Sequence, residues 1–395
     1  MDAIDELLTR GVENIIPSKA ELEKVLRSGN KLNVYLGIDP TATSIHLGNA
    51  VPLRKLQVMM DLGHQVTFLI GDFTALVGDT SDKDSERPIL TEEQIENNFQ
   101  TYKKQAEKFL DFKRVDIHHN SEWLDKLSFR EVIRLFQQFS LNDFISRELI
   151  KRRLSTGGHV RLDEVTYPVM QGYDSYIMDT DIQFGGTDQT FNMQAGRVLL
   201  KNLKNKQSFV VANSFLPGTD GNKMSKTKGN AIFVTEEPTV MFGKLMSIND
   251  DVIIQYFTMA TNLPMEEIKE IEKELQAGKN PMLAKKTLAH QIVKELHGME
   301  AAELAQEQFE MTFQKRDLEN ADIPQMPASI FSSPIEIVEL LLKTKLATSK
   351  SEAKRLLSKQ AVKYNGKIIT INHGVVTVEP KDIITVGKRR FLKFT

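Results

Sequence analysis

The chain contains no cysteine, so it forms neither a disulfide nor a thiolate metal site, and it offers no cysteine nucleophile. Its net charge is only −2, and aromatic residues make up 7% of it, with a single tryptophan. It has no apolar run of the roughly 18 to 20 residues that a membrane-spanning helix needs. Its first residues also lack the basic and apolar regions of a secretory signal peptide. These absences favour a cytoplasmic protein with no membrane partner.

The chain has 395 residues, of which 41% are hydrophobic, and this length is enough for about two to four domains with cores of their own. Its charge is distributed unevenly, because residues 345–395 carry 12 Lys and Arg against 3 Asp and Glu, a net charge of +9. The preceding 344 residues therefore carry a net charge of −11. A basic terminal segment on an acidic body predicts that the tail binds a polyanion, although a tail that only aids solubility is the alternative.

Short apolar, β-branched segments alternate with amphipathic helical segments through the first half of the chain. We expect strands at 32–38, 65–70, 115–118, 182–184 and 209–211, and helices at 19–29, 47–62, 91–110 and 189–203. This alternation predicts an α/β fold with a doubly wound, Rossmann-like parallel sheet that binds its ligand at the carboxyl ends of the strands. More continuous helical periodicity between about 120 and 178 predicts an insertion between two half-sheets.

The second half of the chain has a different pattern. From about 236 to 313, Leu, Ile and Met recur at three- and four-residue spacing, which predicts helices only. Pro324, Pro327 and Pro334 then predict a linker, and the basic terminal segment combines helices with short strands. The expected domains are 1–232 with the insertion at about 120–178, an all-α domain at 233–322, a linker at 323–334, and a small α+β module at 335–395.

Two short segments that lie 177 residues apart indicate a polyphosphate site. An expected strand leads into Asp39-Pro40-Thr41, and a helix begins near His46-Leu47-Gly48-Asn49, so that exposed backbone N–H groups face an anion. The loop Lys223-Met224-Ser225-Lys226-Thr227 supplies ammonium groups to the same anion. Taken alone, His46 is more readily a helix cap, and the lysine loop is more readily a solvated turn. Their presence together and in this order favours the polyphosphate site.

A third segment, Phe184-Gly185-Gly186-Thr187-Asp188-Gln189, follows an expected strand and leads into a helix. Gly186 leaves room for a ribose beside the backbone, and the Asp188 carboxylate suits ribose hydroxyls as an acceptor. The alternative is that Asp188 is a plain helix N-cap.

Three polar side chains share one face of an expected helix. Tyr167, Gln171 and Asp174 fall at positions i, i+4 and i+7, so a phenol, an amide and a carboxylate project together. An ordinary amphipathic helix places Leu or Val on such a face, and a solvent-facing polar stripe is the alternative.

These motifs resemble the signature of the class I aminoacyl-tRNA synthetases, which activate an amino acid with ATP. The resemblance is to the tyrosyl-tRNA synthetases in particular, over nearly the whole chain, and rests on the ordered residues Tyr35, Gly37, Asp39, Pro40, Thr41, His46, Tyr167, Pro168, Gln171 and Asp174. It implies a bacterial-type enzyme that joins L-tyrosine to ATP as tyrosyl-adenylate, releases pyrophosphate and transfers tyrosine to the 3′ end of tRNA-Tyr. It also implies a homodimer and ATP accompanied by Mg²⁺, with no protein-bound structural metal.

The resemblance also implies a role for each candidate residue. Stabilisation of the transition state is assigned to Thr41, His46, Asn49, Lys223, Lys226 and Thr227. ATP binding is assigned to Gly37, Asp39, Gly48, Gly186, Asp188, Met224, Ser225 and Lys226. Tyrosine binding is assigned to Tyr35, Asp79, Tyr167, Gln171, Asp174 and Gln189, with Tyr35 and Asp174 on the phenol hydroxyl. Pyrophosphate contacts are assigned to Lys83 and Arg87.

The terminal module resembles an S4-type RNA-binding domain, and the helical region 233–322 is by the same resemblance the anticodon-recognising domain. The expected RNA phosphate contacts are Lys354, Arg355, Lys388, Arg389 and Arg390. We expect this RNA binding to depend on shape and to be sensitive to salt, without reading bases.

The chain departs from the family pattern at Asn49, where many relatives have a second histidine; an amide donates a hydrogen bond but carries no charge. Three alternatives stay open: a tryptophanyl-tRNA synthetase, a related nucleotidyltransferase, and a non-catalytic synthetase-like RNA-binding protein. Tyr35 with Asp174 favours a phenol over an indole, the basic tail has no purpose in a nucleotidyltransferase, and the intact lysine loop favours catalysis.

Overall fold

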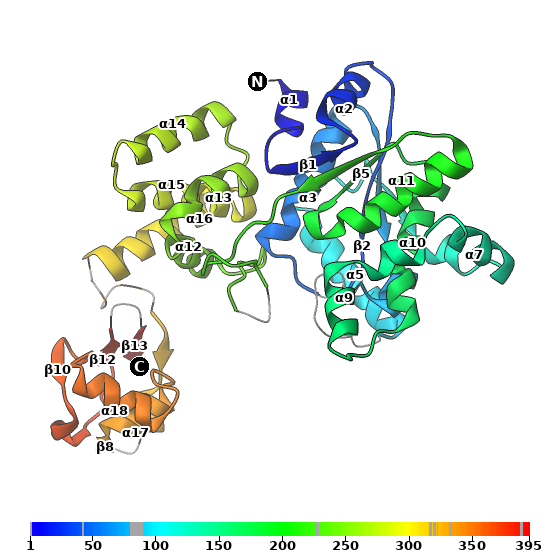
Figure 1. Cartoon of the computed structure of the whole chain (residues 1–395). Coiled ribbons are helices and arrows are strands. Elements are labelled where there is room, and N and C mark those ends of the chain that lie inside the picture. Colours follow the sequence, from blue (N-terminus) through cyan, green and yellow to red (C-terminus); the bar gives the residue numbers. More distant parts are fainter. Residues whose placement is uncertain are drawn as a thin grey trace. The chain divides into compact units, whose positions relative to one another are not determined.

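The structure is a computed structural model that describes residues 2–41, 43–79, 90–225, 229–315, 318, 321, 323–331, 334–387 and 390–395. The chain forms two compact units (Figure 1). The first unit comprises Met1–Glu237 with Lys244–Leu296, and the second comprises Pro238–Gly243 with His297–Thr395. Within the described ranges, no helix combines the length and the apolar character needed to cross a membrane.

The described residues of the first unit contain a six-stranded sheet in the order β1-β6-β5-β2-β3-β4 (Figure 1). Its strands are β1 Val12–Ile16, β2 Asn33–Ile38, β3 Gln65–Ile70, β4 Asp116–His119, β5 Ile182–Gly186 and β6 Phe209–Asn213. The five strands from β6 to β4 run parallel, and β1 pairs antiparallel with β6 at the edge. The predicted doubly wound parallel sheet is confirmed, with one antiparallel edge strand that the sequence pattern did not indicate.

The edge strand β1 lacks the hydrophobic alternation that marks a half-buried strand. Of its five side chains only that of Ile15 is buried, and the register with β6 shifts between Val12 and Asn14. An edge strand is held by backbone hydrogen bonds along one side only, so its pairing requires few apolar residues.

Helices cover the sheet and fill the connections between its strands. They are α1 Ala3–Leu7, α2 Lys19–Leu26, α3 Leu47–Asp61, α4 Asp72–Val77, α5 Glu92–Ala106, α6 Ser121–Leu124, α7 Phe129–Phe136, α8 Leu141–Ile145, α9 Glu148–Ser155, α10 Leu162–Ile177 and α11 Thr190–Lys204. Ser18, Thr91 and Ser128 begin three of these helices by accepting a hydrogen bond from the backbone N–H three residues later. Helices α6 to α10 occupy the chain between β4 and β5, where the sequence predicts continuous helix.

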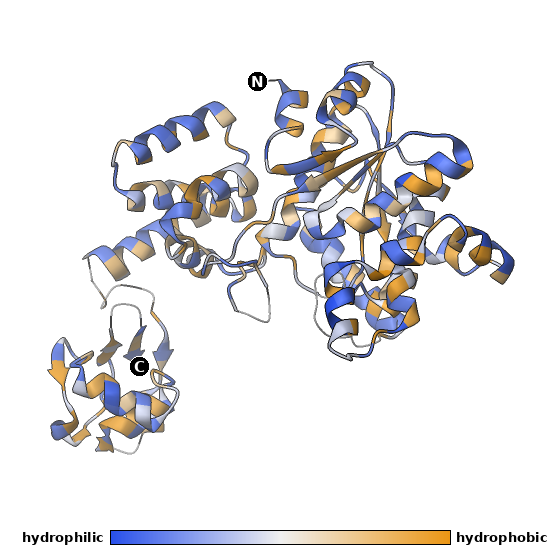
Figure 2. Ribbon diagram, viewed as in Figure 1, coloured by the Kyte–Doolittle hydropathy of each residue, from blue (hydrophilic) through white to orange (hydrophobic). Residues whose placement is uncertain are grey.

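The core of the first unit lies between the sheet and the helices packed on it (Figure 2). Phe68 of β3 and Leu53, Leu56 and Met59 of α3 are completely buried there. The direction of chain progression across the sheet reverses at β2, which pairs with β3 on one side and β5 on the other. The carboxyl ends of β2 and β5 therefore flank the crevice where α/β proteins of this kind bind ligands.

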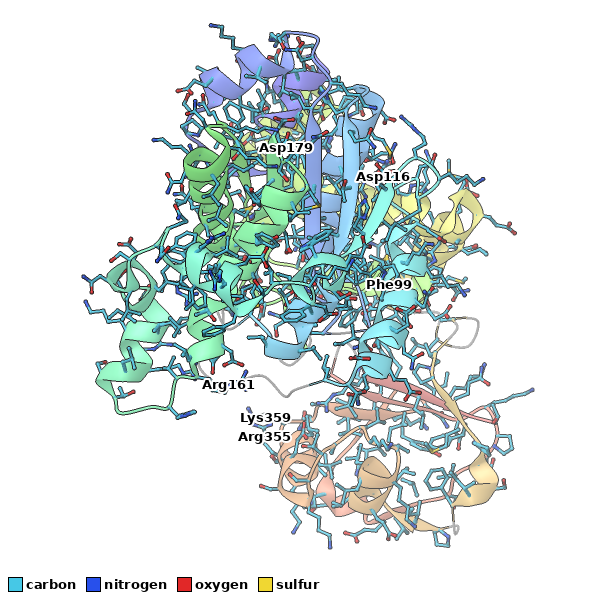
Figure 3. The ribbon with its side chains drawn as sticks, turned by 90° about the vertical axis from the view of Figure 1, so that its right-hand side faces the viewer. Phe99, Asp116, Arg161, Asp179, Arg355 and Lys359 are labelled. Atoms are coloured by element: carbon cyan, nitrogen blue, oxygen red, sulfur yellow. The ribbon has the colours of Figure 1, made fainter. Side chains whose placement is uncertain are left out.

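Figure 3 identifies the two ends of the sheet. Asp116, which begins β4, and Asp179, which precedes β5, lie at the amino ends of the strands. Arg161 lies toward the opposite end, where its guanidinium donates a hydrogen bond to the Val77 carbonyl at 3.1 Å.

Helices follow the sheet, as the sequence predicts for about 236–313. They are α12 Pro238–Met246, α13 Ile253–Ala260, α14 Met265–Gln276, α15 Pro281–His297 and α16 Met299–Phe309. A π-helical turn, Glu310–Lys315, comes after α16.

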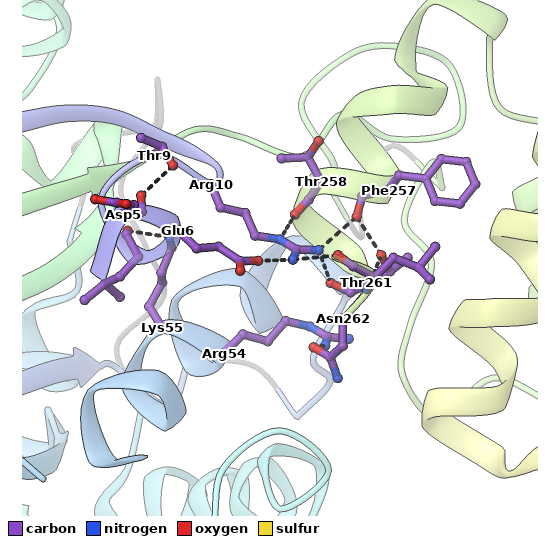
Figure 4. A network of polar contacts seen from close by, with 12 residues as sticks. Asp5, Glu6, Thr9, Arg10, Arg54, Lys55, Phe257, Thr258, Thr261 and Asn262 are labelled. Carbon is purple, nitrogen blue, oxygen red and sulfur yellow. Dashed lines mark hydrogen bonds and ion pairs between the residues drawn. The ribbon is translucent and has the colours of Figure 1, made fainter. Parts of the chain in front are cut away.

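Arg10 joins the beginning of the chain to the carboxyl end of α13 (Figure 4). Its guanidinium donates hydrogen bonds to the backbone carbonyls of Thr258 at 2.6 Å, Thr261 at 2.6 Å and Leu263 at 2.9 Å, and it also pairs with Glu6. The last carbonyls of a helix have no partner within the helix, so a cation there satisfies them and complements the helix dipole. This cap holds α13 against the sheet.

Arg10→Ala should lower the free energy of unfolding of the first unit by about 2 to 3 kcal/mol, because several partly buried carbonyls lose their donor. Urea denaturation followed by the fluorescence of Trp123, the chain's only tryptophan, measures this loss. Arg27→Ala is the matched control, since Arg27 forms exposed ion pairs with Asp2, Asp5 and Glu23 and should change stability little. Equal denaturation midpoints for Arg10→Ala and wild type would contradict the role of the cap.

The described residues of the second unit contain a five-stranded sheet in the order β10-β9-β12-β13-β7. Its strands are β7 Gln325–Met326, β9 Val362–Tyr364, β10 Lys367–Ile369, β12 Ile383–Val386 and β13 Arg390–Phe394. A small pair, β8 Ile335–Glu336 and β11 Val375–Val376, and the helices α17 Ile337–Lys343 and α18 Lys350–Ser358 complete the fold. Leu340, Leu357, Ile384 and Phe394 are completely buried in its core.

Residues 323–331 of the predicted linker at 323–334 are folded in the structure, and residues 332 and 333 lie outside the described residues. Strand β7 pairs in parallel with β13, and the side chains of Ile323, Ala328 and Phe331 are buried. Pro324 and Pro327 flank the two-residue edge strand β7, where a missing N–H interrupts no ladder, and Pro334 directly precedes β8. The segment therefore belongs to the second unit, and this part of the predicted domain division is wrong.

Candidate active site

A cavity of about 270 Å³ opens at the carboxyl ends of β2 and β5, where the strand order reverses. All the predicted tyrosine-binding residues line it, namely Tyr35, Asp79, Tyr167, Gln171, Asp174 and Gln189. Of the other predicted site residues, the cavity is lined by Gly37, Asp39, Thr41 and Asn49. Tyr167, Gln171 and Asp174, which share one helix face, therefore line a cavity. The alternative that this face is a polar stripe exposed to solvent is excluded.

Asp174 and Tyr35 reach the cavity from α10 and β2 and are only 2% and 3% exposed. The Asp174 carboxylate accepts hydrogen bonds from Trp123 Nε1 at 2.7 Å and Asn120 Nδ2 at 3.2 Å. Burial raises the pKa of Asp174 to about 7, although both donors favour the charged form. Burial and the charge of Asp174 also raise the pKa of Tyr35, so its phenol stays protonated.

The sequence pattern gives Asn120 little weight and does not identify Trp123 as a site residue. Both belong to the short segment that follows β4, and they reach Asp174 from more than fifty positions earlier in the chain. The available signal is that the only tryptophan of the chain comes five residues after the end of an expected strand.

The Asp39 carboxylate faces the tyrosine-binding residues. It accepts hydrogen bonds from the Tyr167 hydroxyl at 2.9 Å and from Thr74 Oγ1 at 2.7 Å. A Cβ atom on Gly71 would lie 2.2 Å from Asp39 Oδ1, so only glycine leaves room for the carboxylate. These contacts place Asp39 beside Tyr167, and its assignment to ATP binding stays a prediction.

Asp79 and Gln189 meet at one wall of the cavity. Gln189 Nε2 donates a hydrogen bond to Asp79 Oδ2 at 2.7 Å, and Asn192 Nδ2 donates to Gln189 Oε1 at 3.0 Å. The second bond fixes the Gln189 amide with its nitrogen toward Asp79. Asn192 is completely buried and is a site residue that the sequence analysis did not identify.

His46 is the N-cap of α3, as its alternative interpretation predicts. Its Nδ1 accepts a hydrogen bond from the Asn49 backbone N–H at 3.3 Å, and Asn49 Oδ1 accepts one from the His46 backbone N–H at 3.2 Å. Burial, and then the charge of Lys223, lower the pKa of His46 to about 4, so the ring is neutral at pH 7. Because Nδ1 accepts, the proton lies on Nε2. A Cβ atom on Gly48 would lie 3.1 Å from the His46 ring.

The lysine loop lies beside the segment that contains Asp188. Lys223 Nζ is 3.3 Å from Asp188 Oδ2 and 4.5 Å from the centre of the Phe215 ring. The Ser225 backbone N–H donates a hydrogen bond to Asn230 Oδ1 at 2.8 Å.

A group of predicted residues lies outside the cavity lining and comprises His46, Gly48, Gly186, Asp188, Lys223, Met224 and Ser225. Other predicted site residues lie outside the described residues: Lys83, Arg87, Lys226, Thr227, Lys388 and Arg389.

In the second unit, Lys354 and Arg355 are exposed on α18, and Lys359 follows Arg355 one turn later (Figure 3). Arg390, in contrast, donates hydrogen bonds to the Leu346 carbonyl at 2.6 Å and to Glu352 Oε1 at 3.1 Å. These bonds join β13 to α18 and the segment before it, while 40% of the Arg390 side chain stays exposed, so its contact with RNA phosphate stays a prediction. Across the described part of the chain, His, Asp and Glu side chains form no group of three or more that is placed to hold a metal ion.

Comparison with known proteins identifies the family. The family model described as tRNA synthetases class I (W and Y) matches residues 27–314, and the S4 domain model matches residues 337–384. A tyrosine–tRNA ligase of Thermotoga maritima is 39% identical over 392 residues, which cover 99% of this chain and 96% of that ligase. The chain belongs to the tyrosine–tRNA ligases of class I. A tyrosine–tRNA ligase of Cupriavidus pinatubonensis is 42% identical over 394 residues, covering 99% of this chain and 94% of the relative.

Solved structures of this class share the fold. A truncated Aspergillus nidulans mitochondrial tyrosyl-tRNA synthetase matches with a TM-score of 0.65 at 22% identity, covering 79% of this chain and 94% of that one. The Archaeoglobus fulgidus tyrosyl-tRNA synthetase complexed with L-tyrosine matches with a TM-score of 0.61 at 22% identity, covering 77% of this chain and 100% of that one. These structures confirm the predicted fold class, and the family model with the two relatives confirms the predicted family.

Proposed function

We propose that this class I synthetase activates L-tyrosine with ATP to form tyrosyl-adenylate and then transfers the tyrosyl group to the 3′ end of tRNA-Tyr. The observation that supports this best is the pair Tyr35 and Asp174, whose buried oxygens face one cavity. A tyrosine hydroxyl both donates and accepts hydrogen bonds, whereas the tryptophan indole N–H only donates. A phenylalanine ring in the same place offers neither oxygen a hydrogen bond from the cavity side, which is costly in a buried site.

We propose that the remaining polar groups of the cavity hold the amino acid backbone. Asp79, Tyr167 and Gln171 offer a carboxylate, a phenol and an amide to the α-ammonium group. The tyrosine carboxylate is itself the nucleophile on the α-phosphate, so the reaction needs no nucleophile from the protein. Catalysis then consists of holding the two substrates in place and stabilising the charge that develops on phosphate oxygens.

His46 and Lys223 are suited to the phosphate side of the reaction. His46 carries its proton on Nε2 and therefore offers a neutral N–H donor to an outer phosphate oxygen. Lys223 contributes a positive charge beside it and lowers the pKa of the ring. ATP enters as its Mg²⁺ complex, in which phosphate oxygens and water satisfy most of the metal's ligand positions.

An amino acid panel in the ATP–pyrophosphate exchange assay tests the function. We expect exchange with tyrosine and background exchange with phenylalanine and tryptophan. Preferred exchange with tryptophan would favour the tryptophanyl enzyme instead, and absence of exchange with every amino acid would favour a non-catalytic protein.

Lys223→Ala should slow adenylate formation by about 100-fold, because one charge that stabilises the developing pyrophosphate is lost. Tyrosine affinity should change little, since Lys223 does not line the tyrosine cavity. Single-turnover kinetics measures the rate, and equilibrium dialysis of tyrosine measures the affinity. An unaltered rate would contradict the role of Lys223 in phosphate chemistry.

We propose that the S4 domain binds tRNA through α18 and that the helical region 233–322 contacts the anticodon. Lys354→Ala combined with Arg355→Ala should weaken tRNA charging while leaving pyrophosphate exchange intact, because both lysine and arginine are exposed and far in sequence from the cavity. The loss relative to wild type should shrink as the salt concentration rises, because the variant makes fewer phosphate contacts and its binding therefore depends less on salt. Charging at the wild-type rate across a salt series would contradict this role.

We also propose a cytoplasmic homodimer whose contact includes the insertion. Phe129, Ile133 and Phe136 fall at i, i+4 and i+7 on α7, and Phe129 is 79% exposed. An apolar stripe of this kind on a surface helix is typical of an interface. Analytical ultracentrifugation measures the oligomeric state of both proteins. A wild type that sediments as a dimer and a Phe129→Glu variant that sediments as a monomer would support the proposal.

A further inference from the structure

The loop that joins β2 to α3 forms part of the cavity wall. Thr41 and Ser44 line the cavity from this loop, and Asn49 lines it from the first turn of α3. The sequence assigns Thr41 and Asn49 to stabilisation of the transition state, whereas Ser44 has no assigned role. Residues 39–41 and 43–45 belong to no helix or strand, so the shape of the loop depends on contacts from neighbouring elements.

Gln105 of α5 holds both neighbours of Ser44. Its Oε1 accepts a hydrogen bond from the Ile45 backbone N–H at 2.8 Å, and its Nε2 donates to the Thr43 carbonyl at 2.7 Å. Nε2 also donates to the Thr101 carbonyl of its own helix at 3.0 Å. These partners fix the orientation of the amide, because a flipped amide would turn its oxygen toward two carbonyls and its nitrogen toward an N–H group.

The contacts of Gln105 are shielded from water. Gln105 is 6% exposed and Ile45 is completely buried. The Ile45 carbonyl accepts a hydrogen bond from the Val234 backbone N–H at 3.0 Å, in the segment that follows the lysine loop. Because a buried backbone group without a partner is costly, both polar groups of Ile45 hold it in one position. The residue that follows Ser44 is thus fixed by two different segments of the chain.

A second amide of α5 holds the beginning of the same loop. Asn98 lies seven residues before Gln105 and therefore on the same face of the helix. Its Nδ2 donates a hydrogen bond to the carbonyl of Pro40, which directly precedes Thr41, at 2.8 Å. Thr41 and Ser44 therefore lie between two points at which α5 fixes the backbone of the loop.

The Ser44 hydroxyl lies where an anionic ligand is favoured. Ser44 is partly exposed in the cavity wall, and among the described residues its hydroxyl has no hydrogen-bond partner. It comes shortly before α3, whose N-terminus carries a partial positive charge. The charge of Lys223 also reaches this end of the helix, where it contributes to the lowered pKa of His46. Asp39, the acidic residue of the loop, faces the tyrosine-binding residues instead.

Building on the proposed function, we propose that the Ser44 hydroxyl donates a hydrogen bond to a phosphate oxygen of ATP, and that Gln105 is the positioning residue that holds it there. A hydroxyl is a neutral donor that suits a phosphate oxygen and adds no charge to the site. Its contribution grows as negative charge develops on the phosphate oxygens in the transition state. Ser44 is then a catalytic residue, and Gln105 acts through the backbone on either side of it.

Ser44→Ala tests the role of the hydroxyl. We expect the single-turnover rate of tyrosyl-adenylate formation to fall about tenfold, the lower value for one hydrogen bond to a charged group. The dissociation constant of tyrosine, measured by equilibrium dialysis, should not change, because the hydroxyl contacts ATP. Ser44→Thr keeps the hydroxyl and should restore most of the rate. Thr43→Ala is the matched control, because it removes an exposed hydroxyl from the neighbouring position.

Gln105→Met tests the positioning role. It removes both contacts with the loop, so adenylate formation should fall by a similar factor while tyrosine binding stays unchanged. Adding Gln105→Met to Ser44→Ala should slow the reaction little further, since Gln105 acts through Ser44. Gln100→Met is the matched control, because Gln100 is exposed on the same helix and its amide donates to Glu96.

Three results would overturn these roles of Ser44 and Gln105. A wild-type rate of adenylate formation in Ser44→Ala would show that the hydroxyl does not contact the reacting phosphates. Weaker tyrosine binding at an unchanged rate would place the hydroxyl on the amino acid instead. Losses that multiply in the double variant would show that Gln105 serves the fold and not Ser44.

Ser44→Ala decides the role of the hydroxyl by itself, because it removes one oxygen atom and does not depend on the folding of a Gln105 variant. Absence of adenylate formation by the wild type would instead contradict the proposed function, so the two failures are distinguishable.

Discussion

Asp174→Ala is expected to remove most of the selection of tyrosine over phenylalanine. In wild type, a bound phenylalanine displaces water from the cavity but offers Tyr35 and Asp174 no hydrogen bond in its place, and that cost is the basis of rejection. Tyrosyl-tRNA synthetase is itself the reference case for this effect, at about 10⁵-fold against phenylalanine. Without the carboxylate, only Tyr35 remains to distinguish a hydroxyl from a hydrogen.

The ratio of kcat/KM for the two amino acids in pyrophosphate exchange measures this prediction. Tyrosine activation should fall steeply, and phenylalanine activation should stay level or rise. Asp125→Ala is a suitable control, because Asp125 is exposed in the same part of the chain that contributes Trp123. An unchanged ratio in Asp174→Ala would contradict the assignment of the cavity to tyrosine.

Asp174→Asn is expected to change how the stability of the first unit depends on pH. The pKa of Asp174 is about 7 in the folded protein and lower in an unfolded chain, so the folded state binds a proton more tightly. Ionisation therefore favours unfolding as pH rises from about 4 to 7, by up to about 4 kcal/mol in total. Below this window both states are protonated, and above it both are ionised.

Asparagine at this position does not titrate, so the difference in unfolding free energy between wild type and Asp174→Asn isolates this contribution. We expect wild type to lose stability relative to the variant between pH 4 and pH 7 and the difference to be constant above pH 7.5. Urea denaturation at several pH values, followed by the fluorescence of Trp123, measures it. A difference that does not depend on pH would show that Asp174 is not perturbed by burial. A buried carboxyl group that lowers stability in this way is typical of a functional site.

The local pattern was sufficient to predict α10 and its contribution to the cavity. Tyr167, Gln171 and Asp174 belong to one helix, and helical geometry alone puts them on one face. The same holds for His46 and Asn49, which begin α3 within one turn of each other. The strands β2, β3, β5 and β6 were also predicted, because strands buried on both faces are apolar throughout.

Contacts between distant segments were not predictable in this way. Trp123 and Asn120 meet Asp174 only because β4 and α10 converge, and Asn192 orients Gln189 only after α11 has packed. No local pattern distinguishes such residues from other buried polar side chains. The strand β7 was mistaken for a linker because its partner, β13, lies some 65 residues later, and its prolines carry no information about that pairing.

The sequence by itself determined the α/β class, the family and several of the polar side chains that line the cavity, because these depend on periodicity and on motifs within single elements. Only the tertiary structure decided the partner of each polar group: Asp39 with Tyr167, Arg390 with Glu352, and Tyr35 with Ser175 and Gln183. The physical reason is that a hydrogen bond requires two groups within about 3 Å. Packing sets that distance, and for groups far apart in the chain packing is a property of the whole fold.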